Sequence, residues 1–212
     1  MNPLRRHGVL VAMLAAFVPA DGRASDAAAD SEPAISGTVT GYYYAMRDQP
    51  DFGVGVASIN RGALHVEARY NYEASDAGSA FLGWKFSGGD AVTFEVTPII
   101  GVLFGAARGA IPGFEASVAY RSVDAYIEAE YVYDSENHSD SYFYAWSEIA
   151  WKPVEWLRLG LAGQRTHEVQ SSRDLQLGLF AQLMFPKATL GVYVFNPDIG
   201  SRYAIVAFGV QF

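Results

Sequence analysis

Few residues of the chain have the types and spacing that catalysis requires. The segment 134–140 reads DSENHSD and brings serine, histidine and carboxylates together, a set that could form a hydrolytic triad or bind a divalent cation. A triad needs fixed geometry that one loop rarely supplies, and these residue types are common in solvated turns. His167 is no stronger a candidate, and the chain contains no cysteine, phosphate-binding loop, zinc-ligand spacing or nucleophile elbow. We therefore predict no catalytic residue, no cofactor and no bound metal.

A second group of polar residues is defined by its spacing. In the segment 64–72, apolar residues alternate with His65, Glu67, Arg69 and Asn71. Period two is the side-chain period of a β-strand, in which successive side chains point to opposite faces. The same alternation recurs through the chain after residue 35, where we find neither a helical period nor an apolar run of about 18 residues. The chemistry of these residues thus depends on a sheet.

The alternating pattern divides the chain into about twelve strands. Their connections are alternately very short and longer, which is typical of a barrel with tight turns on one rim and outer loops on the other. An even number of strands returns the chain to the rim from which it started. The predicted strands are 36–46, 52–60, 63–73, 79–87, 91–100, 112–121, 124–134, 141–151, 155–166, 174–185, 188–196 and 202–212.

The N-terminus has the pattern of a Sec-type signal peptide. Arg5 and Arg6 precede an apolar run at 8–18, and small residues before the end of residues 1–24 provide a cleavage site. Residues 25–34 are small and acidic, which predicts a disordered periplasmic lead-in. The whole chain has a formal net charge of −8. Such an acidic chain is not expected to bind nucleic acid, because binding phosphates needs clustered lysine and arginine.

The composition favours a membrane barrel over the main alternative, a soluble β-sandwich, whose strands also alternate. Half of the residues are hydrophobic and 18% are charged, against about 25% charged residues in soluble domains. Aromatic residues on the apolar side of the strands lie near strand ends, as the aromatic girdles of a membrane barrel require. These residues are Tyr70, Tyr72, Tyr131, Tyr133, Trp151 and Phe185.

The last strand carries a family resemblance. The chain ends in YAIVAFGVQF, with a terminal aromatic residue on the apolar side. Together with the signal peptide and the alternating strands, this ending resembles the bacterial outer-membrane β-barrel proteins over residues 35–212. The resemblance implies a Gram-negative outer membrane as the location and an antiparallel up-and-down barrel as the fold. It also implies that Phe208, Val210 and Phe212 form the insertion signal that the barrel-assembly machinery reads.

Alternation then predicts which residues line the interior. A basic residue that faces lipid near the midplane costs about 2–4 kcal/mol and an acidic one somewhat less, so charged residues at middle depth must face inward. The predicted lining has six carboxylates and four bases, which suits either a cation-favouring constriction or a salt-bridged plug. Bulky interior aromatics favour a narrow or partly occluded lumen. The predicted lining residues are Glu67, Arg69, Lys85, Glu95, Glu115, Arg121, Glu128, Glu130, Glu148 and Arg158.

The hairpin at 99–113 differs from the other connections. It is apolar and glycine-rich, and Pro98 and Pro112 are expected to interrupt strand ladders at its base. Two interpretations are open. The segment could be a pair of strands that projects beyond the membrane, or a loop that folds into the barrel and narrows it.

The function expected from these patterns is a narrow, porin-like channel for small polar or cationic solutes. Outer-membrane lipid and the assembly machinery are its expected partners. Two alternatives stay open at this stage. One is an outer-membrane hydrolase that uses His138 or His167, and the other is a closed barrel whose outer loops bind a ligand or partner.

Overall fold

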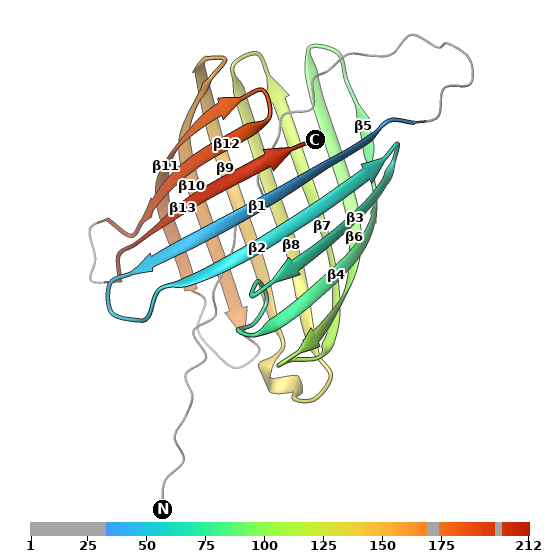
Figure 1. Cartoon of the computed structure of the whole chain (residues 1–212), viewed down its shortest axis with the longest axis vertical. Coiled ribbons are helices and arrows are strands. Elements are labelled where there is room, and N and C mark those ends of the chain that lie inside the picture. Colours follow the sequence, from blue (N-terminus) through green and yellow to red (C-terminus); the bar gives the residue numbers. More distant parts are fainter. Residues whose placement is uncertain (1–32, 169–173, 198–200) are drawn as a thin grey trace, which may run out of the picture.

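The computed structural model describes residues 33–168, 174–197 and 201–212. The predicted signal peptide and most of the predicted lead-in lie outside these residues. The described chain winds into a barrel of tilted antiparallel strands (Figure 1). Among the described residues, no helix is both long and apolar enough to cross a membrane.

The strands follow one another along the chain and pair with their sequence neighbours. A single short 3₁₀ helix among the described residues, η1 (His138–Asp140), lies in the loop before β9. The strands are β1 (Ile35–Met46), β2 (Phe52–Arg61), β3 (Leu64–Tyr70), β4 (Ala77–Trp84), β5 (Phe86–Gly88), β6 (Val92–Gly105), β7 (Gly109–Tyr120), β8 (Val123–Asp134), β9 (Tyr142–Val154), β10 (Leu157–Glu168), β11 (Asp174–Phe185), β12 (Ala188–Phe195) and β13 (Tyr203–Gln211).

The barrel closes between the first and last strands, where β1 pairs with β13 over nine residue pairs. Strands β4 and β5 both pair with β6, on either side of a break at Lys85. Together they occupy the place of one strand, so the described part of the chain forms a twelve-stranded barrel. The prediction of an antiparallel barrel of about twelve strands is confirmed. Closure leaves no unpaired sheet edge among the described strands, which is the condition for placing a sheet in lipid.

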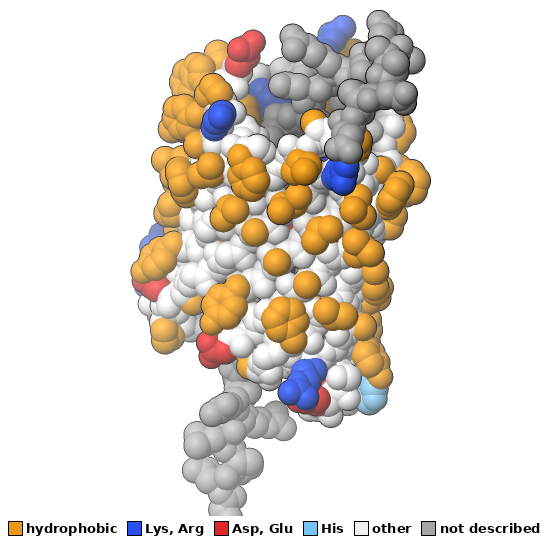
Figure 2. Space-filling model, turned by 45° about the vertical axis from the view of Figure 1, so that its right-hand side comes forward, with side chains coloured by type: hydrophobic (Ala, Val, Ile, Leu, Met, Phe, Trp, Pro, Cys, Tyr) orange, Lys and Arg blue, Asp and Glu red, His pale blue; other side chains and the backbone are white. Residues whose placement is uncertain are grey.

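The outer surface is apolar because one side of each strand points away from the barrel. Along β11, Leu175, Leu177 and Leu179 are each more than half exposed. Phe180, the residue after Leu179 on the same strand, points to the other side and is buried. Figure 2 shows hydrophobic side chains spread over the middle of one face, with charged side chains mainly at the two ends. Such a band matches the hydrocarbon core of a bilayer.

The interior is filled by side chains. Trp146, Tyr193, Phe195 and Ile205 have no exposed surface. The Phe195 and Tyr203 rings stack with centroids 5.0 Å apart, and the Trp146 ring lies 5.3 Å from that of Phe195. Aromatic side chains therefore pack against one another inside the half of the barrel nearer the long loops. This agrees with the narrow or occluded lumen expected from the bulky interior residues.

Two details differ from, or decide between, the sequence expectations. The prediction that Tyr72 faces outward was wrong, because β3 ends at Tyr70 and Asn71 takes a positive φ of 61°. The chain turns inward there, and Tyr72 is buried. The hairpin at 99–113 is a continuous pair of strands, with β6 and β7 paired as far as Leu103 and Gly109. It does not fold into the barrel.

Candidate functional site

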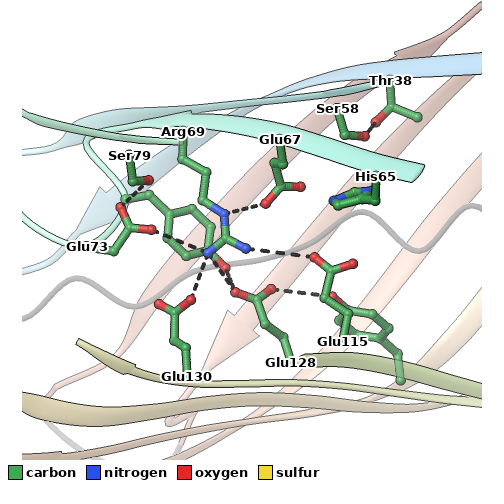
Figure 3. Close-up of polar contacts among 12 residues, drawn as sticks. Thr38, Ser58, His65, Glu67, Arg69, Glu73, Ser79, Glu115, Glu128 and Glu130 are labelled. Carbon is green, nitrogen blue, oxygen red and sulfur yellow. Dashed lines mark hydrogen bonds and ion pairs between the residues drawn. The ribbon is translucent and has the colours of Figure 1, made fainter. Parts of the chain in front are cut away.

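A cluster of carboxylates around one arginine is the main polar feature of the interior. The Arg69 side chain, on β3, is 1% exposed. It donates hydrogen bonds to four carboxylates and lies within 4 Å of a fifth (Figure 3). We call this set the Arg69 cluster. Its nitrogen–oxygen distances are 2.5 Å to Glu67, 3.4 Å to Glu73, 3.8 Å to Glu115, 2.9 Å to Glu128 and 3.0 Å to Glu130.

The barrel brings these residues together from strands that are not neighbours. Glu67 and Arg69 occupy inward positions of β3, whereas Glu115 lies on β7 and Glu128 on β8, across the interior. The guanidinium carbon of Arg69 also lies 4.0 Å from the centre of the Tyr72 ring. With every group ionised, five carboxylates and one guanidinium give a formal charge of −5 + 1 = −4.

A second cluster, formed by β8, β9 and β10, is balanced in charge. Arg158, on β10, contacts Asp124 at 2.6 Å and Glu148 at 2.5 Å. Lys152 contacts Asp124 at 3.1 Å, and the Gln182 amide oxygen accepts a further hydrogen bond from Arg158. Two bases thus face two carboxylates. This composition is that of a structural ion network, whereas the Arg69 cluster has five carboxyl groups around a single base.

A cavity of about 510 Å³ lies beside the Arg69 cluster, toward the rim with the short turns. His65, Glu67 and Glu115 line it, and the ion pair between Lys85 and Glu95, 3.1 Å apart, lies in its wall. His65 is 6% exposed. Threonine, serine and asparagine side chains complete the polar lining. The cavity is large enough to hold several waters or a small solute.

The structure places most of the predicted lining residues inward. Those that are fully buried are Glu67, Arg69, Glu128, Glu130, Glu148 and Arg158. Lys85, Glu95 and Glu115 are partly exposed and line the cavity. The prediction that Arg121 lines the interior was wrong, because Arg121 lies exposed in the turn between β7 and β8. Its φ is 54°, and its guanidinium lies over the Tyr120 ring.

Two carboxylates of these clusters were not among the predicted lining residues. Asp124 stands on the inward side of β8 by simple alternation and could have been counted. Glu73 lies beyond the end of β3, in a connection that folds back inside the barrel. Alternation holds only while a strand continues, so no sequence signal marked Glu73.

The remaining sequence candidates lie at the surface. The polar groups of the 134–140 loop hydrogen-bond mostly to one another, with Asn137 accepting from Ser139 and the Asp134 carboxylate accepting from two backbone N–H groups. This pattern is that of a stabilised turn. The residues of the predicted insertion signal, Phe208, Val210 and Phe212, all point outward on or just after β13.

Comparison with known proteins places this fold. No protein-family model matches the sequence, and no curated protein matches it. Among solved structures, the chain is similar to a KdgM porin in complex with disordered oligogalacturonate, with a TM-score of 0.60 and 9% identity. A second KdgM porin structure gives a TM-score of 0.57 and 11% identity, and each match covers 82% of this chain and 98% of the other. At such identities the likeness concerns the architecture alone, and this architecture is the antiparallel barrel predicted from the sequence.

Proposed function

We propose that the chain is a non-enzymatic barrel of the outer membrane that passes small cationic or small polar solutes through a narrow lumen. The apolar outer band supports lipid as its surroundings. The outward position of Phe208, Val210 and Phe212 at the closing strand supports their role as the signal for the assembly machinery. A Gram-negative cell and export through a cleaved leader are part of the same proposal.

The observation that carries this proposal is the excess negative charge of the Arg69 cluster. Five carboxylates converge on a single guanidinium in the part of the interior that adjoins the cavity. Acidic rings inside a pore attract cations and repel anions. Oligogalacturonate, which accompanies the KdgM porin structure, is a polyanion. It is therefore not the solute that this interior suits.

The packed interior sets the expected size of the current. Because aromatic residues pack the interior of the half nearer the long loops, we expect ions to pass only when interior side chains move. We expect brief openings of small conductance.

Reversal potentials in planar bilayers test the proposal. The wild-type barrel in a potassium chloride gradient should show cation selectivity, and Glu128→Gln with Glu130→Gln should reduce it. Glu136→Gln with Asp140→Asn removes the same number of charges from an exposed loop, where the ion pair of Glu136 with Arg108 is 3.8 Å long, and is the matched control. Anion selectivity in the wild type, or equal selectivity in all three proteins, would contradict the proposal.

The same packing also favours a second candidate, a permanently closed barrel whose outer loops bind a partner. It predicts no conductance from protein that is demonstrably folded and inserted. It also predicts binding that is lost when residues 135–140 are replaced by a glycine–serine linker. Repeated silence in bilayers would favour this candidate over the channel.

A further inference from the structure

One side chain of the cavity has a polar atom without a partner. His65 is buried, and its Nδ1 lies 2.9 Å from the Asn60 side-chain oxygen. Because an amide oxygen can only accept, Nδ1 carries the proton and Nε2 carries a lone pair. No atom in the described part of the chain hydrogen-bonds to Nε2. An imidazole that donates from one nitrogen to an oxygen and offers the other nitrogen has the arrangement of a metal ligand.

Two carboxylates lie beside this histidine. His65, Glu67 and Glu115 each offer a ligand atom, and these three atoms lie within 4.8 Å of one another. Figure 3 shows the His65 ring next to the carboxylates of Glu67 and Glu115, which come from opposite walls of the barrel. This is the one group of histidine and carboxylate side chains in the described ranges that is close enough to hold an ion.

The charge around the group calls for a cation. Glu67 and Glu115 belong to the Arg69 cluster, whose formal charge is −4. Uncompensated carboxylates in a protein interior are costly, and they are stabilised by protons or by bound cations. Arg69 donates a hydrogen bond of 2.5 Å to one carboxylate oxygen of Glu67. The nearest distance between an Arg69 nitrogen and a Glu115 oxygen is 3.8 Å. Glu115 is 17% exposed and borders the cavity, so it is the ligand with the most freedom to adjust.

We propose that His65, Glu67 and Glu115 bind a divalent transition-metal cation, with Zn²⁺ as the representative ion. One nitrogen and two carboxylate oxygens suit this class of ion. Ligand atoms in a tetrahedral zinc site lie about 3.3 Å apart, so the three atoms, which lie within 4.8 Å of one another, would move closer together when the ion binds. The cavity leaves the fourth position open to water or solute. Asn60 orients the imidazole.

The site does not depend on the proposed channel, because a closed barrel with this cavity would bind the ion equally well. No metal site is expected from the sequence, because the spacing of the three ligands along the chain matches no recognised metal-binding motif. The barrel alone brings β3 and β7 face to face at this depth.

Calorimetric titration of Zn²⁺ into the folded, tag-free barrel in detergent tests the site, after removal of metal with a chelator. We expect one ion per barrel, and His65→Gln and Glu115→Gln should each weaken binding by about 100-fold or more. Asn60→Ala should weaken it by about 10-fold. The control is His138→Ala, which removes an exposed loop histidine that contacts Tyr133 and should leave binding unchanged.

A second measurement separates ligation from folding. Co²⁺ in place of Zn²⁺ should give visible absorption with the wild type and the His138 variant, and not with His65→Gln or Glu115→Gln. The mobility of unheated samples on gels reports whether each variant is folded. Wild-type affinity in folded His65→Gln or folded Glu115→Gln would overturn the proposal, as would loss of the binding in His138→Ala or the absence of one-to-one binding in the wild type.

Discussion

Replacing Arg69 with methionine should destabilise the barrel more than most single substitutions. Methionine keeps an unbranched side chain that can still pack against the Tyr72 and Phe81 rings, whose centres lie 4.0 and 4.2 Å from the guanidinium. The substitution therefore isolates the loss of charge. It leaves Glu128 and Glu130, both almost fully buried, without the cation that bonds to them at 2.9 and 3.0 Å.

The expected loss follows from burial. Removing one partner of a buried ion pair costs about 3–5 kcal/mol, because the other charge stays buried and uncompensated. The control is Lys85→Met, whose ion pair with Glu95 is 24% exposed on the lysine side and 28% on the glutamate side. A pair with this much solvent should contribute about 0–1 kcal/mol.

Equilibrium unfolding of the barrel in urea, followed by tryptophan fluorescence and by gel mobility, measures both losses. Adding Glu128→Gln to Arg69→Met should recover part of the lost stability, since it removes one of the orphaned charges. The gap between Arg69→Met and wild type should also narrow as pH falls, because the orphaned carboxylates then take up protons. A loss for Arg69→Met no larger than that for Lys85→Met would refute the reasoning.

Two further predictions concern packing in the interior. Trp146→Ala should lower the free energy of unfolding by about 3–5 kcal/mol, because that side chain has no exposed surface. Trp151→Ala should lower it much less in the same urea titration, because Trp151 is 53% exposed on the outer face. Equal losses would contradict an interior packed with aromatic side chains. Gly101→Ala would place a Cβ 2.4 Å from the Phe81 ring and should cost about 1–3 kcal/mol. Gly55→Ala meets no atom within 4 Å and is its control. An unchanged midpoint for Gly101→Ala would mean that Phe81 can move aside.

The alternation of apolar and polar residues and the lengths of the turns predict the fold from the sequence. Side chains on a strand change face at every residue, so Glu67 and Arg69 had to share a face, and so did Glu128 and Glu130. The cost of placing charge in lipid decided which face was inside. These arguments are local in sequence, and they held wherever a strand continued without interruption.

They failed where strands end. Arg121 lies in a turn and Tyr72 lies two residues beyond the end of β3, so the alternation that assigned them to a face no longer applied. Glu73 entered the interior from a connection for the same reason. Pro98 was expected to break a ladder, and the pairing of β4 with β6 indeed ends at Ile99.

By itself, the sequence determined that this is an antiparallel barrel of about twelve strands with an apolar exterior and a charged interior, because the period of the strand and the energetics of lipid act residue by residue. Which charges meet was decided only by the tertiary structure. Closure of the barrel sets strands far apart in sequence across a shared interior, and this places five carboxylates on Arg69 and leaves Arg158 in a balanced network. The same closure brings Glu115 of β7 to His65 and Glu67 of β3, a contact between walls that no spacing along the chain encodes.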